Sequence, residues 1–184
     1  TPMMPLGTVR WIFVHTAAYS GECDAAEIDA WHRARGWAAI GYHYVVRRSG
    51  LIEPGRSLEY AGAHVEGCNT KSVGICCEGH GDYEEHTAAQ RSSLLDLCRT
   101  LMQKYELGHE AVLGHREVNR LVAAGVVGDH YRTYKTCPGN RVDMDAIRAA
   151  LALPEDLPEP VVALVDSTAG LRVPGAPAPR PIDG

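Results

Sequence analysis

Short apolar runs separated by polar segments recur along the chain and predict the strands of a sheet. Residues 10–15, 72–79 and 111–115 are each short and apolar, which is typical of buried strands. Residues 42–47 and 51–53 predict two more strands, because a short segment with a glycine joins them and Pro-Gly ends the second. These runs together supply the strands of one sheet.

Three other stretches show the spacing of amphipathic helices. Apolar residues recur at helical spacing over residues 25–35, 88–105 and 144–151. A residue that caps helices well precedes each stretch: Asp24, Thr87 and Asp143. Residues 116–134 lack this regularity, and we expect a loop or a broken helix there. Strands that alternate with helices indicate an α/β fold in which helices cover the sheet.

The length of the chain and its proline distribution predict one domain followed by a tail. A chain of 184 residues can bury one substantial core, and a second full domain is not expected. From residue 154 onward the composition changes, since seven of the 11 prolines lie there. We therefore expect a folded domain over residues 1–153 and an extended, proline-rich tail over residues 154–184.

Composition and charge narrow the class of partner. The chain is 45% hydrophobic and 22% charged, as soluble globular proteins are. A net charge of -5 provides no basic patch, so we do not expect a nucleic acid partner. No apolar run approaches the roughly 20 residues that cross a bilayer, and we expect no membrane partner. The first residues lack the features of a secretory signal, which leaves the localisation undecided.

The chain has six cysteines, and a domain of this size does not need disulfides for stability. Cys76 and Cys77 are neighbours in a predicted strand, and Cys98 lies among leucines, so we expect most of the thiols to be reduced and structural. Cys137, in the stretch YKTCPGN, allows more readings. It can be a core thiol, a nucleophile, half of a disulfide or a metal ligand.

Two histidines end predicted strands and suggest a metal site. His15 ends the apolar run IFVH, and His115 ends AVLGH. Together with Cys137 they would provide three ligands for zinc, and an open catalytic zinc site takes three protein ligands of this kind. No local CxxC or HExxH pair supports that assignment. From spacing alone, histidines that hydrogen-bond within the core are the favoured interpretation.

Five sequence blocks occur in an order that resembles a known family. They are IFVHTA, WHRARGWAAIGYHYVVRRSGLIEPGR, GAHVEGCNTKSVGICCEG, LGHREV and KTCPG. In this order they resemble the zinc-dependent N-acetylmuramoyl-L-alanine amidases, a family with the fold of the peptidoglycan recognition proteins. The resemblance covers residues 10–151. It implies a single α/β domain with a central mixed β-sheet flanked by helices.

The resemblance also implies an activity and a set of metal ligands. The activity is hydrolysis of the amide bond between N-acetylmuramic acid and L-alanine in peptidoglycan. The family's zinc ligands correspond to His15, His115 and Cys137, which makes Cys137 a zinc thiolate. A thiol nucleophile is not expected, because the motif provides a metal and no adjacent base.

Four further residues acquire expected roles from the resemblance. Tyr42 corresponds to a tyrosine near the metal-bound water, and Lys135 to an active-site lysine that would stabilise the oxyanion. Glu78 corresponds to a catalytic glutamate of muropeptide-recycling amidases, which the phage enzymes of the family lack. His64 would line the substrate groove or hydrogen-bond within a loop. If these assignments fail, Tyr42 is an aromatic residue that packs on the sheet, and Lys135 is a solvated lysine in a loop.

Several alternatives differ in class. The chain could be a non-catalytic peptidoglycan-binding module, or a scaffold with a structural zinc ion. As an enzyme it suits a phage or prophage endolysin, present in the host cytoplasm before release to the wall, or a bacterial recycling amidase. The expected partners are peptidoglycan or muropeptides, and we expect a monomer. One departure from the phage enzymes is a longer segment at residues 122–134.

Overall fold

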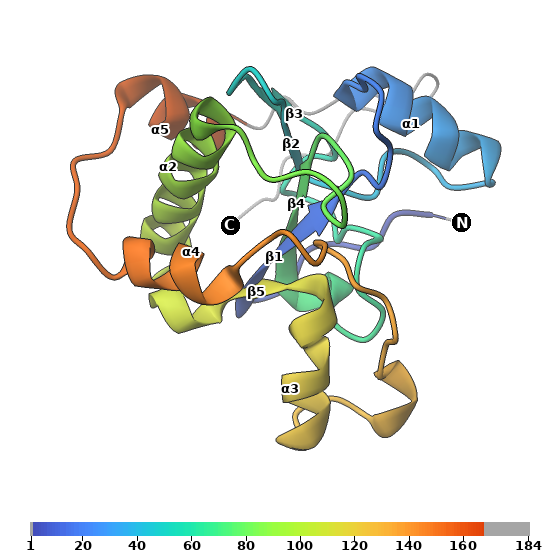
Figure 1. The fold of residues 1–184 in the computed structure, drawn as a ribbon. Helices are drawn as coiled ribbons and strands as arrows, with labels where there is room; N and C mark the ends of the chain where they lie inside the picture. Colours follow the sequence, from blue (N-terminus) through green and yellow to red (C-terminus); the bar gives the residue numbers. More distant parts are fainter. Residues whose placement is uncertain (1, 168–184) are drawn as a thin grey trace, which may run out of the picture.

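A five-stranded sheet forms the centre of the computed structural model, which describes residues 2–167 (Figure 1). The strands are β1 (Trp11–Thr16), β2 (Tyr44–Val46), β3 (Ile52–Pro54), β4 (Ser72–Cys77) and β5 (Val112–Gly114). Their order in the sheet is β3-β2-β4-β1-β5. β4 pairs parallel with β2 and β1, β1 pairs parallel with β5, and β3 pairs antiparallel with β2. The expected mixed sheet is confirmed.

Helices cover the sheet, as expected for this fold class. They are α1 (Ala25–Ala34), α2 (Ala88–Tyr105), α3 (Val118–Ala123), α4 (Met144–Leu151) and α5 (Glu159–Asp166). All three predicted caps are confirmed, because the side chains of Asp24, Thr87 and Asp143 each accept a hydrogen bond from the backbone three residues later. The segment 116–134 is a broken helix made of α3 and short 3-10 turns.

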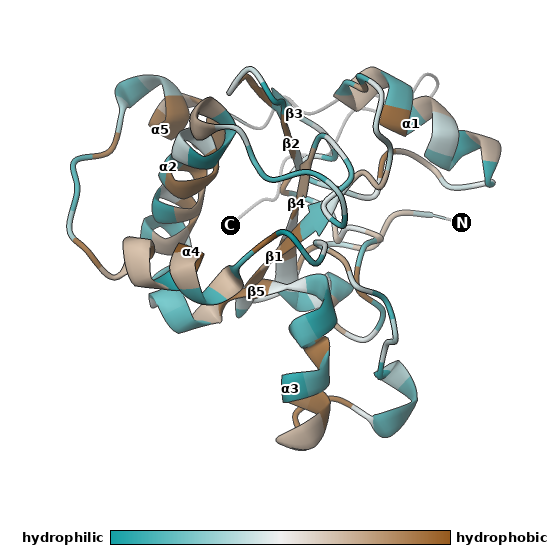
Figure 2. Cartoon of the chain, viewed as in Figure 1, coloured by the Kyte–Doolittle hydropathy of each residue, from teal (hydrophilic) through white to brown (hydrophobic). Residues whose placement is uncertain are grey.

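Successive side chains of a strand point to opposite faces of the sheet, and the two faces of this sheet differ. Ile12 and Val14 of β1 point into the large core beneath α2 and α4, where Leu94, Leu97 and Leu101 are also fully buried. Each of these leucines contributes about 1.5–3 kcal/mol by leaving water. Figure 2 draws most of the length of the central strands in brown, the colour of hydrophobic residues.

The opposite face carries smaller clusters and leaves space for polar side chains. Trp11 and Phe13 of β1 pack in one cluster, and Val45 and Cys76 pack with α1 in another. His15 follows Phe13 by two residues and therefore points to this same face. The predicted strand 42–47 is shorter in the structure, so Tyr42 precedes β2.

The expected extended tail is wrong for part of its length. Residues 159–166 form helix α5, in which Val165 is buried and Val161 and Leu164 pack on the core beside α2 (Figure 1). Pro160 lies in the first turn, where a missing N–H costs no helical hydrogen bond. The rest of the predicted tail, residues 168–184, lies outside the described residues, and the division of the chain at residue 153 stays a prediction.

Two expectations about the whole chain can be compared with the structure. None of the six cysteines forms a disulfide, and five of them are buried, as expected for most of the thiols; the half-buried one is Cys137. None of the helices among residues 2–167 has the length and apolarity that crossing a membrane requires.

Candidate active site

Three expected ligand residues converge at the carboxyl end of the parallel strands. His15 lies near the end of β1, His115 directly follows β5, and Cys137 lies in the loop before α4. One nitrogen of each histidine and the Cys137 Sγ all lie within 4.8 Å of one another. Because β1 and β5 are adjacent and parallel, residues at their ends meet at the same edge of the sheet.

The donor atoms in this cluster fit a zinc ion. Two imidazole nitrogens and one thiolate sulfur are ligands that zinc takes in sites with an open fourth position. In the part of the chain that the structure describes, no further histidine, cysteine or carboxylate joins the group. A closed structural site would need a fourth protein ligand, so the cluster has the composition of an open site.

The surroundings of Cys137 disfavour a free thiolate. Burial raises the pKa of Cys137 to about 11, although the Thr16 N–H, which lies 3.4 Å from Sγ, acts in the opposite direction. Without a bound metal ion, the thiol is therefore protonated near neutral pH and is a weak nucleophile. Nδ1 of His15 lies 3.6 Å from Sγ.

Both histidines of the cluster are uncharged rings. Burial lowers the pKa of His15 well below its usual range, and the nearby His64 and His115 lower it further. Burial and the positive charge of Lys135 lower the pKa of His115 to about 4. Uncharged imidazole has a free lone pair, which is the form that binds a metal.

Tyr42 and Lys135 flank the cluster from different directions. The Tyr42 ring makes tilted contacts with His15, at a centroid distance of 5.0 Å, and with His32, at 5.5 Å. Burial raises the pKa of Tyr42 well above its usual range, so its hydroxyl is a hydrogen-bond donor. Lys135 is exposed on the Cys137 loop, and its charge lowers the pKa of both cluster histidines.

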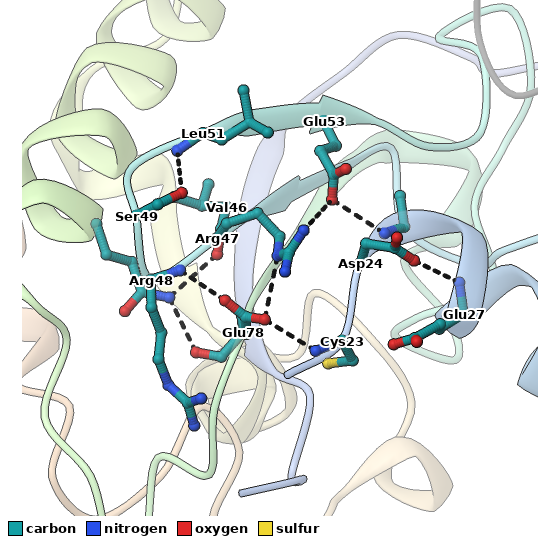
Figure 3. Close-up of polar contacts among 12 residues, drawn as sticks. Cys23, Asp24, Glu27, Val46, Arg47, Arg48, Ser49, Leu51, Glu53 and Glu78 are labelled. Carbon is teal, nitrogen blue, oxygen red and sulfur yellow. Dashed lines mark hydrogen bonds and ion pairs between the residues drawn. The ribbon is translucent and has the colours of Figure 1, made fainter. Parts of the chain in front are cut away.

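Glu78 is engaged in a network that ties three chain segments together (Figure 3). One carboxylate oxygen accepts from the Arg48 N–H at 2.8 Å, and the other accepts from the Cys23 N–H at 2.8 Å and from the Arg47 guanidinium at 3.1 Å. Burial alone would raise the pKa of Glu78, but these three donors lower it. Glu78 thus links β4 to the segment before α1 and to the β2–β3 turn.

His64 contacts the cluster through His15. Its Nδ1 lies 2.9 Å from Nε2 of His15, and its Nε2 lies 3.4 Å from the Ser72 hydroxyl. Both ring nitrogens of His64 are therefore occupied within the protein. His32 accepts from the Gly41 N–H and His43 from the Gly74 N–H, so each of these rings is hydrogen-bonded within the protein.

The loop that carries Cys137 is held by Asp82, a residue that the sequence analysis missed. The two carboxylate oxygens of Asp82 accept hydrogen bonds from the Thr136 hydroxyl and from the Asn140 N–H, each at 2.9 Å. A side chain on Gly81 would overlap the Pro138 carbonyl oxygen. No sequence pattern connects these two loops, so only their packing could reveal the contact.

The longer segment at residues 122–134 is anchored beside this loop. The Asn119 side chain donates to the Thr133 carbonyl and accepts from the Thr133 N–H, both at 2.9 Å. The Lys135 N–H in turn donates to the Thr133 hydroxyl at 3.2 Å. Val127 packs on the cluster that contains Phe13. The segment therefore supports the chain just before Lys135.

Comparisons with known proteins agree with this arrangement. The family model described as N-acetylmuramoyl-L-alanine amidase matches residues 5–140. The endolysin of Escherichia phage T7 is 40% identical over 115 residues, which cover 58% of this chain and 74% of the phage protein. The endolysin of Enterobacteria phage T3 is 38% identical over 109 residues, which cover 55% of this chain and 72% of the phage protein.

Solved structures show the same fold. The N-acetylmuramoyl-L-alanine amidase LysC of Clostridium intestinale aligns with a TM-score of 0.71 at 30% identity, over 84% of this chain and 92% of LysC. Drosophila PGRP-LB aligns with a TM-score of 0.65 at 22% identity, over 83% of this chain and 88% of that protein. The second likeness concerns the fold alone.

Proposed function

The chain belongs to the N-acetylmuramoyl-L-alanine amidase family, and from this premise we propose that His15, His115 and Cys137 hold a catalytic zinc ion. The enzyme cleaves the amide bond between N-acetylmuramic acid and L-alanine in peptidoglycan, as a phage endolysin. The convergence of the three ligand atoms within 4.8 Å carries the zinc proposal. A bound zinc ion lowers the pKa of a water molecule and polarises a carbonyl group.

Within this proposal, Lys135 stabilises the negative charge that develops on the scissile carbonyl oxygen. Its ammonium group is close enough to the cluster to lower the pKa of His15 and His115. A fixed positive charge of this kind is most effective where charge appears only in the transition state. The contacts of residues 119 and 133 support this role, because they order the chain just before Lys135.

Tyr42 would act as a hydrogen-bond donor at the cluster. Contacts of its ring with His15 and His32 hold the ring in place, and the raised pKa keeps its hydroxyl protonated. It therefore suits orientation of the attacking water or of the substrate carbonyl better than removal of a proton.

In this proposal Glu78 holds the chain segments around the site in place and does not exchange protons. Both of its oxygens already accept hydrogen bonds, and its Arg47 partner also contacts Glu53 at 3.6 Å. A carboxylate bound in this way has a depressed pKa and is a poor base near neutral pH. In this respect the chain follows the phage enzymes, for which no such base was expected.

The proposal is tested by measuring zinc and product together. Wild-type enzyme should contain one zinc ion per chain and should release free stem peptide from peptidoglycan, and chelation should abolish that release. Zinc-free wild-type protein with full activity after chelation would contradict the metal assignment. Binding to sacculi without any release of stem peptide would favour a binding module, and a strong preference for soluble muropeptides would favour a recycling enzyme.

A further inference from the structure

The two ring nitrogens of His15 face different partners. Nδ1 faces the metal cluster, at 3.6 Å from the Cys137 Sγ. Nε2 faces away from it, at 2.9 Å from Nδ1 of His64. The His15 and His64 rings meet edge to face, with an interplanar angle of 89° and a centroid distance of 5.0 Å. A proton must therefore lie between these two rings, on one nitrogen or the other.

A backbone carbonyl determines which ring carries that proton. The Ser72 hydroxyl is buried and donates to the Cys68 carbonyl oxygen at 2.8 Å, and a carbonyl oxygen can only accept. Having used its hydrogen there, the Ser72 oxygen acts as the acceptor toward Nε2 of His64, at 3.4 Å. His64 consequently carries its hydrogen on Nε2, and its Nδ1 is an acceptor. His15 must then donate from Nε2, which leaves the lone pair on Nδ1.

We propose that His64 is a positioning residue: with Ser72 and the Cys68 carbonyl, it holds His15 in the tautomer and orientation whose Nδ1 lone pair faces the metal. This inference rests on the proposed zinc site and adds a residue that acts through a ligand. A partner that accepts from the second nitrogen of a ligating histidine fixes the ring and makes it a stronger base.

The packing around His64 restricts it to this position. Its ring lies over Gly74 of β4, where a Cβ would come within 2.6 Å of the ring. The Asn69 side chain accepts from the His64 N–H and from the Val65 N–H, both at 2.9 Å, and so holds the backbone of this loop. The absence of a side chain at position 74 thus provides the space in which His64 reaches His15.

The tautomer itself can be measured by nitrogen-15 NMR of the imidazole rings, with zinc bound and after chelation. We expect Nε2 of both His15 and His64 to carry the proton. Observation of the proton on Nδ1 of His64 would overturn the proposed direction of the hydrogen-bond chain. Ser72→Ala removes the hydroxyl while keeping His64, and it should yield a mixture of His64 tautomers.

Zinc affinity tests the consequence for the metal. Titration with Zn²⁺ against a competing chelator should show a loss of about 10–100-fold for His64→Leu, which has no acceptor for His15. In His64→Asn the side-chain oxygen can take the place of Nδ1, and the affinity should return to within about threefold of wild type. His43→Asn, which removes a neighbouring buried histidine outside the chain of bonds, is the matched control and should leave zinc affinity unchanged.

The outcomes separate this inference from the zinc proposal. If wild-type protein binds no zinc, the proposed function fails. If wild type binds zinc and folded His64→Leu binds it equally well, the zinc proposal stands and the role of His64 is refuted. Should His64→Leu fail to fold, the NMR tautomers of wild type and Ser72→Ala still decide the question.

Discussion

The backbone N–H of Thr16 lies 3.4 Å from the Sγ of Cys137 and donates to it across 121 residues of sequence. Thr16 directly follows His15, so one strand end supplies a metal ligand and a hydrogen bond to a second ligand. A hydrogen bond to sulfur also stabilises the thiolate form. The geometry of the cluster therefore depends on how the Cys137 loop docks on β1.

Replacement of Cys137 should separate metal binding from folding. Cys137→Ser should lower zinc content and turnover by roughly 10²-fold or more, because a serine hydroxyl is a far weaker zinc ligand than a thiolate. Cys98→Ala is the control, since it removes a buried thiol from the α2 core and should cost stability while retaining zinc. Zinc per chain by elemental analysis, together with stem-peptide release, measures both effects. Full zinc occupancy in Cys137→Ser would refute the ligand assignment.

Lys135→Ala should affect the reaction and spare the fold. Lys135 is an exposed loop residue, so we expect an unchanged melting temperature and an unchanged zinc content. Turnover should fall by roughly 10²-fold, which is the usual consequence of losing one group that stabilises an oxyanion. Lys71→Ala, another exposed lysine, provides the control for loss of charge. Near-wild-type turnover in Lys135→Ala would refute the proposed role.

Glu78→Gln should lower the stability of the fold and largely spare turnover, which is the reverse of what we expect for Lys135→Ala. The amide cannot keep all three hydrogen bonds and the ion pair with Arg47, and we expect a loss of about 1–3 kcal/mol in the free energy of unfolding. Turnover of the folded fraction with zinc bound should stay within about threefold of wild type. Denaturant unfolding and stem-peptide release measure the two quantities. A loss of turnover on the order of 10²-fold at full stability would instead mark Glu78 as a catalytic group.

Local signals in the sequence predicted much of this structure, and contacts between distant segments were not predictable from it. The Thr87 and Asp143 caps depend on residues three positions away, and both were confirmed. A buried glutamate at position 78 suits a base and an anchor equally well in sequence, and only its three donors distinguish the two roles. The contacts of Asp82 and His64 depend on how separate loops pack, which no local pattern encodes.

The proline-rich composition beyond residue 154 misled the sequence prediction because it obscured an apolar helix face. Val165 is buried and Val161 and Leu164 are partly buried against the core, so deletion after Leu153 should cost about 3 kcal/mol of unfolding free energy. Zinc content and turnover on muropeptides should remain near wild type, since α5 lies on the face of the sheet opposite His15. Pro158→Ala, before α5, is the matched control and should change stability little. An unchanged melting temperature after deletion would show that α5 does not dock in solution.

The two hydrogen bonds that Asp82 accepts from the Cys137 loop, called the Asp82 clamp below, should make the stability of this loop sensitive to acid. The Asn140 N–H and the Thr136 hydroxyl lower the pKa of Asp82 below its usual value of 3.8. A carboxyl group whose pKa is depressed by folding contributes stability above its unfolded-state pKa and loses that contribution as the pH falls through the folded-state value. Wild-type protein should therefore lose the contribution of the clamp progressively below about pH 3.8.

Asp82→Asn tests this directly, because the variant has no carboxyl group to titrate and an amide cannot accept at both positions. Near neutral pH it should be less stable than wild type and should bind zinc less tightly, since the ends of the Cys137 loop are no longer held. As the pH falls toward about 3, the difference in stability between the two proteins should shrink, because protonation removes the same interaction from wild type. Thermal unfolding across this pH range measures the difference, and Asp156→Asn, at an exposed position remote from the loop, is the control. A stability difference that stays constant down to low pH would show that the Asp82 carboxylate does not hold the loop.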